Sequence, residues 1–262
     1  MLGQSAPDGL HAALCDALPG WVKEVFKQRP EIWGKGSDGL DLVTSLDLGM
    51  QKLLEAKLPE LFPGSSVVGE EDYRSLEGSG PLWVVDPLDG TVNFVAGVPV
   101  YSVAVALIID GRPALSAVYD VVQEDIYSAQ RGSGAFLNGT ALLPTPSRSK
   151  LAVVSSGLLK DFADVAPDAL IQLLSDFKLR NFGSQAMHLC YAAAGKVSLV
   201  ASREAKGWDD MAGALIAKES GLNYGSYDLC AASVSLDDDQ KSLCAPPEIF
   251  DKHRPLFARS CT

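Results

Sequence analysis

The chain has 262 residues, of which 47% are hydrophobic and 21% are charged. This composition is typical of a folded globular protein that buries a core without disulfide or metal staples. Acidic residues outnumber basic ones by 33 to 22, so the formal net charge is −11. Such a charge repels nucleic-acid backbones, and we expect no nucleic-acid partner. An anionic substrate would need metal ions to offset the charge.

The cysteine pattern and the hydrophobicity profile predict a cytoplasmic protein. The five cysteines are odd in number and scattered, with no C-x-x-C pair, which disfavours a disulfide framework or a zinc cluster. No apolar run approaches the ~18 residues that a membrane span needs, and no secretory signal is recognisable. We therefore expect no membrane partner.

The first half of the chain predicts two helices followed by strands. Apolar spacing indicates a helix over residues 8–28, bent near Pro19, and a second over 44–58, ended by Pro59. Short strands are expected at 66–69 and 82–85. Longer strand-like runs at 100–109, 114–121 and 126–129 are separated by short turns, which favours antiparallel neighbours.

The second half predicts alternating strands and helices. Two prolines in the polar segment 144–147 mark the internal boundary. Strands are expected at 151–155, 178–182 and 197–201, and helices at 165–175, 184–194 and 209–221. Interleaved elements in both halves predict a layered α/β or α+β fold. We expect a single domain of two packed lobes, about 1–145 and about 146–262.

The strongest motif for chemistry is Asp86-Pro87-Leu88-Asp89-Gly90-Thr91, which follows an apolar strand. In a continuing strand Asp86 and Asp89 would face opposite sides, so we expect a proline-fixed turn that lets them converge. Gly90 permits close approach of an anion, and free N–H groups of Gly90 and Thr91 would bind it. Hard oxygen ligands beside an anion site indicate magnesium and phosphate, although an ordinary capped turn is the alternative.

Two other families share parts of this motif. A calcium-binding EF-hand loop needs an acid at its third and twelfth positions, which are Leu88 and Gly97 here, so it is excluded. Haloacid-dehalogenase phosphatases carry Asp-x-Asp-Gly-Thr, with one residue between the aspartates. This chain has two residues there, so that family is kept only as a weaker alternative.

Three further acidic segments accompany the motif. Glu70, Glu71 and Asp72 follow a predicted strand, and alone they are typical of a solvated turn. Asp209 opens a predicted helix as its N-cap and could still direct one oxygen to a metal. Lys35 precedes segment 41–47, in which a hydroxyl group and Asp47 enter the second helix.

Together, in order and spacing from Lys35 to Glu219, these four segments resemble the inositol monophosphatase family of Mg²⁺-dependent, Li⁺-sensitive phosphatases. The resemblance implies an αβαβα sandwich of the inositol monophosphatase and fructose-1,6-bisphosphatase type, commonly a homodimer. It also implies a site for two to three Mg²⁺ ions and a small phosphorylated metabolite as the substrate.

The resemblance also implies roles for individual residues. Glu70, Asp86 and the carbonyl of Leu88 would hold the first ion, and Asp86, Asp89 and Asp209 the second. Asp47 and Glu70 would position a third ion and its water, and Thr91 would orient the attacking hydroxide. Phosphate would bind along residues 88–91, namely Leu88, Asp89, Gly90 and Thr91.

The substrate side departs from the family pattern. Members specific for inositol phosphates carry a glutamate six residues before the Trp of the Trp-Asp pair, where this chain has Ser202. Arg203 and Lys206 add two cations nearby, which favours a substrate with a second anionic group or a different carbon skeleton. The alternative is that they only balance Glu204 and Asp210 at the surface.

A second substrate-side segment is Gly183, Ser184 and Gln185, which aligns with a turn that contacts substrate in relatives. Gln185 is bulkier than the alanine common there. His188, within a predicted helix, is assigned no catalytic role.

The sequence thus predicts Mg²⁺-dependent hydrolysis of a small phosphate monoester by activated water, without a covalent enzyme intermediate. Phosphatases for bisphosphonucleosides, fructose 1,6-bisphosphate or histidinol phosphate are alternatives within the superfamily. A binding protein for a phosphometabolite that has lost turnover is the alternative from another class.

Overall fold

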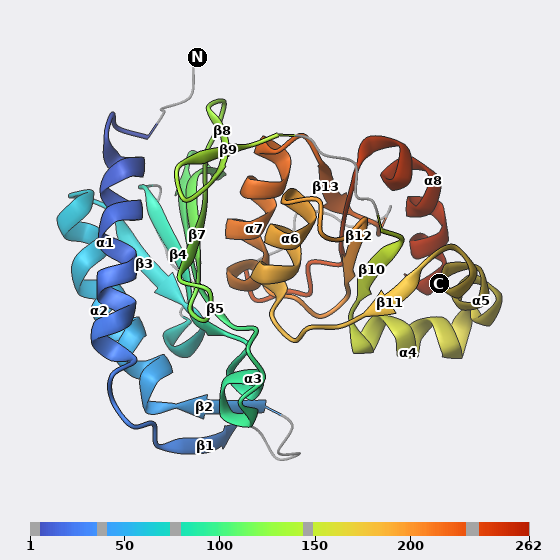
Figure 1. Ribbon diagram of the computed structural model, residues 1–262, viewed down its shortest axis with the longest axis horizontal. Coiled ribbons are helices and arrows are strands. Elements are labelled where there is room, and N and C mark those ends of the chain that lie inside the picture. The colour runs from blue at the N-terminus through green and yellow to red at the C-terminus, as the bar shows by residue number, and fades with distance from the viewer. Residues whose placement is uncertain (1–5, 36–40, 74–79, 144–148, 229–235, 262) are drawn as a thin grey trace.

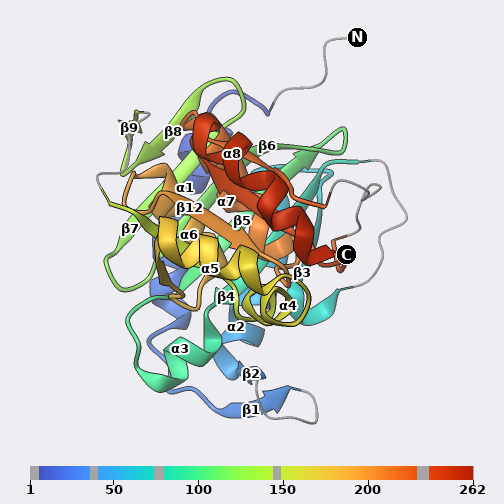
Figure 2. The same ribbon diagram turned by 90° about the vertical axis from the view of Figure 1, so that its right-hand side faces the viewer.

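The computed structural model describes residues 6–35, 41–73, 80–143, 149–228 and 236–261, and it arranges them in five layers (Figure 1). Helices α1 (Leu10–Val25) and α2 (Ser45–Leu61) form the first layer. They pack on a seven-stranded sheet, and α6 (Gln185–Ala193) and α7 (Gly207–Glu219) lie between this sheet and a second one. Helices α4 (Ser156–Val165), α5 (Pro167–Asp176) and α8 (Pro247–Ala258) cover the outer face of the second sheet (Figure 2). This arrangement confirms the predicted αβαβα sandwich.

The first sheet has the strand order β3-β4-β5-β6-β7-β8-β9. Its strands β3 and β4 are parallel and the remaining neighbours are antiparallel. The strands are β3 (Ser66–Gly69), β4 (Leu82–Asp89), β5 (Ser102–Ile109), β6 (Arg112–Asp120), β7 (Asp125–Gln130), β8 (Gly134–Leu137) and β9 (Thr140–Leu142).

The second sheet has the order β11-β10-β12-β14-β13, in which β11, β10 and β12 are parallel and β14 is antiparallel to both neighbours. Its strands are β10 (Leu151–Val154), β11 (Lys178–Arg180), β12 (Leu199–Ser202), β13 (Asn223–Ser226) and β14 (Ser242–Ala245). A separate hairpin of β1 (Ile32–Lys35) and β2 (Asp41–Thr44) and the short helix α3 (Thr91–Ala96) flank the first sheet. The described residues also form two 3₁₀ turns, η1 (Glu70–Asp72) and η2 (Arg259–Cys261).

The outer helices of the first half carry apolar side chains at four-residue spacing. One stripe on α1 includes Leu14 and Leu18, and one on α2 includes Met50 and Leu54, all fully buried. Both stripes pack against Trp83 and its neighbours on the sheet. Burial of these stripes fixes the two helices on one face of the first sheet.

The central helices α6 and α7 pack unusually close to each other. A Cβ atom at Gly213 of α7 would lie 2.6 Å from the Cβ of Leu189 on α6, so only glycine fits there. Because both helices are covered by sheets, most of their residues are buried, and many of the buried residues are glycine or alanine. This contact holds the first turns of the two helices near each other.

Several predicted boundaries differ from the structure. Helix α1 runs through Pro19, as predicted, but is shorter at both ends, whereas α2 continues through Pro59 to Leu61, because a proline in the last turn removes only one hydrogen bond there. The predicted helix at 165–175 is α5, and α4 before it was missed, as were the hairpin β1–β2, strands β8, β9, β13 and β14, and helix α8. The predicted boundary at 144–147 lies outside the described residues. Among the residues that the structure describes, no helix is long and apolar enough to cross a membrane.

Two leucines on α2 provide a test of this core. Leu54 is fully buried, whereas Leu48 is 39% exposed. We expect Leu54→Ala to lower the free energy of unfolding by about 2–5 kcal/mol, because it leaves a cavity under the sheet. Leu48→Ala should change it by less than about 0.5 kcal/mol. Urea unfolding of both variants measures the difference, and equal effects would contradict the packing of α2.

Candidate active site

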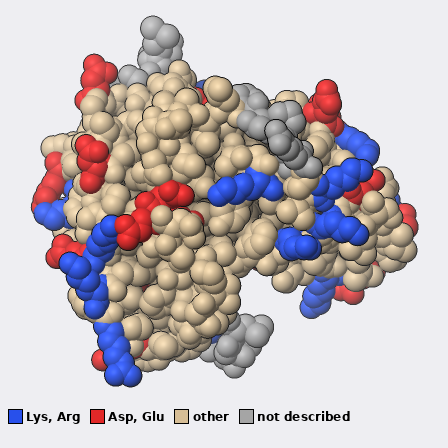
Figure 3. All heavy atoms as spheres, viewed as in Figure 1, with Lys and Arg blue, Asp and Glu red and all other residues tan. Residues whose placement is uncertain are grey.

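A cleft of about 670 Å³ opens between the two halves of the molecule. Its walls come from the β1–β2 hairpin, the end of β4, and the first turns of α3, α6 and α7. The surface is hollowed between the α3 end of the first half and the α4 end of the second (Figure 3). The cleft is lined by most of the residues predicted for the site, namely Lys35, Glu70, Asp86, Leu88, Asp89, Gly90, Thr91, Gly183, Ser184, Gln185, Ser202, Lys206 and Asp209.

A β-bulge at the end of β4 brings Asp86 and Asp89 to the same cleft. Asp86 pairs with Ala104 and Asp89 with Ser102, so three steps on β4 match two on β5. The extra residue reverses the alternation of side chains, and both carboxylates line the cleft. The predicted proline turn was therefore wrong. The strand continues to Asp89, and a bulge in it, not a turn, brings the two carboxylates to the same side.

Three carboxylates from separate elements converge in the cleft. Glu70 lies in the 3₁₀ turn η1 after β3, Asp86 on β4 and Asp209 in the first turn of α7. Each offers one oxygen, and these oxygens all lie within 4.8 Å of one another. An all-oxygen donor set of this kind fits Mg²⁺, which prefers hard carboxylate and carbonyl ligands.

The convergence of these acids disfavours their charged forms. Burial raises the pKa of Asp86 well above its ordinary value, and the negative charges of Glu70, Asp89 and Asp209 add to the rise. Burial also raises the pKa of Asp209, with the charge of Asp89 as the next cause. A divalent cation would reverse this effect, since it stabilises every carboxylate that contacts it.

Asp89 is hydrogen-bonded by groups at the N-terminus of α6. Its oxygens accept hydrogen bonds from the Ser184 hydroxyl at 2.5 Å, the Gln185 N–H at 2.9 Å and the Ala186 N–H at 2.8 Å. Ser102 on β5 adds a longer contact of 3.3 Å. Burial raises the pKa of Asp89 to about 6, although these hydrogen bonds oppose the rise. Asp89 thus joins the end of β4 to α6 in the second half.

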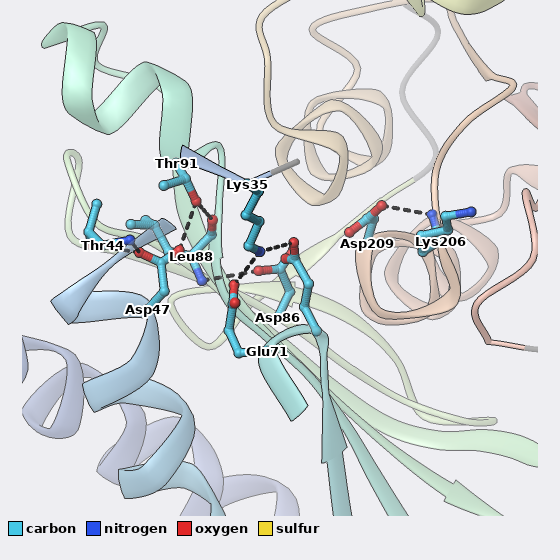
Figure 4. A network of polar contacts seen from close by, with 10 residues as sticks. Lys35, Thr44, Asp47, Glu71, Asp86, Leu88, Thr91, Lys206 and Asp209 are labelled. Atoms are coloured by element: carbon cyan, nitrogen blue, oxygen red, sulfur yellow. Dashed lines mark hydrogen bonds and ion pairs between the residues drawn. The ribbon is translucent and has the colours of Figure 1, made fainter. Parts of the chain in front are cut away.

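Lys35 on the hairpin lies between two acids (Figure 4). Its Nζ donates to Glu70 Oε1 at 2.7 Å and to Glu71 Oε1 at 2.6 Å. Burial lowers the pKa of Lys35, but the two carboxylates outweigh it and the net shift is upward. The sequence grouped Glu71 with a solvated acidic run, whereas its side chain is only 7% exposed and holds this lysine.

Asp47 lies behind Thr91 and does not line the cleft (Figure 4). Thr44 is the N-cap of α2, and its N–H donates to Asp47 Oδ2 at 2.8 Å in a capping box. Asp47 Oδ1 lies 2.8 Å from the Thr91 hydroxyl, which is also 2.9 Å from the carbonyl oxygen of Leu88. Asp47 therefore reaches the cleft through Thr91.

Asp209 is not the N-cap of α7, contrary to the sequence-based expectation. The N-cap is Lys206, because the Gly207 N–H bonds to the Leu236 carbonyl at 2.7 Å and the helix starts two residues earlier. Asp209 Oδ2 accepts the Lys206 backbone N–H at 2.7 Å (Figure 4). This hydrogen bond aims the carboxylate into the cleft.

Both cations of the segment 202–207 have carboxylate partners. Lys206 Nζ lies 2.7 Å from Asp239 Oδ1 at the edge of the cleft. Arg203 Nε lies 2.7 Å from Asp161 Oδ2, away from the cleft-lining residues. The charges are thus balanced, as in the alternative interpretation, but by acids that the sequence did not pair with them.

Ser202, which the sequence analysis placed on the substrate side, lines the cleft together with residues that the analysis did not assign to it. Ser202 is buried and accepts the Ala205 N–H at 3.2 Å. Glu204 lines the cleft and accepts the Ser155 hydroxyl at 2.6 Å and the Gly157 N–H at 3.0 Å, at the start of α4. Ser155 and Asn181 also line it.

His188 lines the cleft, and both of its ring nitrogens take part in hydrogen bonds. Its Nε2 accepts the Phe182 N–H at 3.1 Å, which leaves Nδ1 as the donor to Gln185 Oε1 at 3.2 Å. Burial lowers the pKa of His188 to about 3. His188 is thus a packed helical side chain with both ring nitrogens hydrogen-bonded.

Comparison with protein families settles the relationship. The family model described as the inositol monophosphatase family matches residues 12–253. The chain belongs to the inositol monophosphatase family. This confirms the family predicted from the four segments, and with it the predicted class of enzyme, a phosphoric monoester hydrolase.

Individual members of the family extend the comparison. The chain is 37% identical over 194 residues to inositol-1-monophosphatase of Mycobacterium leprae, covering 69% of this chain and 67% of that protein. It is 36% identical over 209 residues to Nus factor SuhB of Pasteurella multocida, covering 76% and 77%. A staphylococcal inositol monophosphatase solved with its products shares the fold, with a TM-score of 0.80 and 23% identity over 95% of this chain and 93% of that one.

The crowded carboxylates predict a stability that falls as pH rises when no metal is present. Asp89 has a pKa of about 6 in the folded protein and about 4 when unfolded, so between these values the folded form retains a proton that the unfolded form has lost. The free energy of unfolding therefore decreases from about pH 4 through about pH 6, and Asp86 and Asp209 extend the decrease upward. Melting temperatures in EDTA against pH measure this slope.

The variant Asp86→Asn tests whether a carboxylate charge causes this decrease. Asparagine keeps an oxygen that accepts the Leu88 N–H, but it removes the charge. Near pH 7 in EDTA we expect its melting temperature to exceed that of the wild type by roughly 2–4 °C or more. In excess Mg²⁺ the order should reverse. An equal or lower melting temperature in EDTA would contradict the repulsion.

Proposed function

We propose that this protein hydrolyses a small-molecule phosphate monoester with Mg²⁺ as cofactor. The observation that carries the proposal is the convergence of Glu70, Asp86 and Asp209, whose oxygens lie within 4.8 Å of one another beside the start of α3. Membership in the inositol monophosphatase family supports it. When bound, magnesium ions would neutralise the phosphoryl oxygens, lower the pKa of a water molecule and stabilise the leaving alkoxide.

In this proposal, different residues of the cleft would bind the metal ions and the phosphate group. Glu70, Asp86, Asp89, Asp209 and the Leu88 carbonyl would hold two ions. Glu70 would also position a third ion, and Asp47 would act on the water of that ion through Thr91. The N–H groups of Gly90 and Thr91 lie at the start of α3, where the first N–H groups of a helix have no partner within it. They would bind phosphate oxygens. A Cβ at Gly90 would lie 3.0 Å from the Val100 carbonyl oxygen, so this close turn requires glycine.

Thr91 would orient the nucleophilic water. Its single hydroxyl proton is directed toward Asp47 Oδ1 at 2.8 Å or the Leu88 carbonyl at 2.9 Å. A lone pair of the Thr91 hydroxyl oxygen would accept a hydrogen bond from the water. That hydrogen bond would turn a lone pair of the water toward phosphorus. Glu70 lies at the cleft edge and would take up the proton that the water releases.

We propose a substrate with one phosphate and a leaving group without a second anion. Support comes from Lys206 and Arg203, which are each paired with an aspartate, and from Glu204, which adds a negative charge to this wall of the cleft. A second phosphate would meet no unpaired cation among these residues. Gly183, Ser184, Gln185 and Ser202 would contact the leaving group.

The proposal extends to the two lobes of the chain and to its oligomeric state. We infer one domain of two lobes, with metal and phosphate bound mainly by about 1–145 and the leaving group by about 146–262. A cytoplasmic homodimer is the assembly that the family resemblance implies. Light scattering of the purified protein measures its mass in solution.

A second candidate function is phosphometabolite binding without turnover. It is favoured by one observation, that a relative 36% identical to this chain is named a Nus factor rather than a phosphatase. Phosphate release separates the two candidates. Binding of a phosphate monoester with no release in excess Mg²⁺ would favour the second.

The proposed substrate class is tested with four phosphate esters. We expect phosphate release from inositol 1-phosphate and histidinol phosphate at a higher kcat/KM than from 3′-phosphoadenosine 5′-phosphate or fructose 1,6-bisphosphate. Excess EDTA should abolish all activity and Mg²⁺ should restore it. A clear preference for either bisphosphate would contradict the argument from paired cations, and turnover in EDTA would contradict the metal dependence.

Thr91→Val tests the orientation of the water. Valine keeps the shape of the side chain and removes the hydroxyl, so kcat should fall by about 10²-fold or more with little change in KM. Thr140→Val, on the exposed strand β9, is the matched control and should leave both constants unchanged. An unaltered kcat in Thr91→Val would remove Thr91 from the mechanism.

A further inference from the structure

Asp210 is a buried acid that the proposed mechanism does not use. It follows Asp209 in the first turn of α7 and is 1% exposed. Its Oδ1 accepts the side-chain N–H of Gln185 at 2.7 Å, and its Oδ2 accepts the hydroxyl of Tyr224 on β13 at 2.8 Å. Ser242 on β14 provides a further hydrogen bond. These donors provide hydrogen bonds to both oxygens of a carboxylate that is buried away from bulk water, so Asp210 has a fixed position in the fold.

Gln185 connects this acid to a second carboxylate of the cleft. Its backbone N–H donates to Asp89 Oδ1 at 2.9 Å, while its side chain donates to Asp210. Its Oε1 receives Nδ1–H of His188, which fixes which way the amide points. One residue at the start of α6 thus holds Asp89 through its backbone and the neighbour of Asp209 through its side chain.

The first turn of α6 donates hydrogen bonds to one acid of the cleft, and the first turn of α7 carries another. The α6 N-terminus grips Asp89 and the first turn of α7 carries Asp209. The helices are in direct contact further along at Gly213 and Leu189, and the Gln185–Asp210 hydrogen bond joins them at the end that faces the cleft. A change at this bond would alter the separation of Asp89 and Asp209 while the rest of the helix contact is retained.

We propose that Gln185 and Asp210 are positioning residues that fix the separation of Asp89 and Asp209 and thereby set the affinity of the cleft for a divalent cation. This inference rests on the proposed function, in which those two aspartates hold one ion. Residues that orient metal ligands typically contribute 10–100-fold to affinity without touching the metal. Gln185 therefore acts through its two hydrogen bonds and not only as a bulkier side chain facing the substrate.

The test compares three variants of the full chain by direct binding of Mn²⁺, followed by the electron paramagnetic resonance signal of the free ion. Gln185→Met keeps the length of the side chain and the backbone N–H but removes the amide. Tyr224→Phe removes a donor to Asp210 from outside the cleft. Tyr227→Phe is the matched control, since Tyr227 is buried in the second core and its hydroxyl has no partner among the described residues.

We expect Gln185→Met to bind Mn²⁺ about 10–100-fold more weakly than the wild type. Tyr224→Phe should weaken binding in the same direction by a smaller factor, and Tyr227→Phe should stay within about twofold. The Mg²⁺ concentration that gives half-maximal activity should shift in parallel in both variants. For Tyr224→Phe, which alters a residue that does not line the cleft, kcat at saturating Mg²⁺ should return close to the wild-type value. A merely structural role would lower the melting temperature and the active fraction without shifting the half-saturating concentration.

Wild-type Mn²⁺ affinity in both Gln185→Met and Tyr224→Phe would overturn the inference, and if Gln185→Met does not fold, Tyr224→Phe alone decides. Failure of the proposed function looks different. A wild-type protein that binds Mn²⁺ but releases no phosphate contradicts the phosphatase and leaves the binding comparison intact. A wild-type protein that binds no Mn²⁺ overturns both.

Discussion

The structure depends on the repulsion among carboxylates that both halves of the chain bring into one cleft. Two full charges about 5 Å apart repel each other by about 3 kcal/mol at an effective dielectric constant of about 20. A group of several such acids thus opposes a folding free energy that is typically only 5–15 kcal/mol. Burial is the main cause of the raised pKa values of Asp86 and Asp209, and this repulsion adds to the rise. A divalent cation converts it into attraction, so the same geometry that destabilises the free protein creates the binding site.

Local devices of the backbone hold each acid against this repulsion. The bulge in β4 turns Asp86 and Asp89 to one side, and the N–H groups at the start of α6 hold Asp89. A hydrogen bond from the Lys206 N–H orients Asp209, and the capping box of α2 holds Asp47 behind Thr91. These anchors belong to β4 and to helices that pack on the two sheets, so the fold itself sets where each acid lies. Lys35 offsets part of the charge from the hairpin side.

The sequence predicted the layered fold and the segments of the site because both depend on local patterns. Four-residue apolar spacing located α1 and α2, and the order of four acidic segments located Glu70, Asp86, Asp89 and Asp209. Elements without such a pattern were missed. Strand β13 has one large apolar residue among its four, and in α8 the apolar residues are interrupted by charged residues and a proline, so neither a strand nor a helix pattern is clear there.

The contacts that the sequence did not predict join residues far apart in the chain. The bulge could not be anticipated, because it is defined by the register of β4 against β5 and not by β4 alone. The same holds for the ion pairs of Arg203 with Asp161 and Lys206 with Asp239, and for the hydrogen bond of Gln185 with Asp210. Side-chain pairs of this kind decide which charges remain for a substrate, so the charge balance of the substrate side could not be predicted from local patterns.

Anomalous diffraction from crystals soaked in Mn²⁺ tests the central claim most directly, since it locates the ion without any assumption about the substrate. The account predicts an anomalous peak in the cleft within coordination distance of oxygens from Glu70, Asp86 and Asp209 at once. A well-diffracting soaked crystal with no peak there, or with manganese bound only at other surface acids, would contradict it.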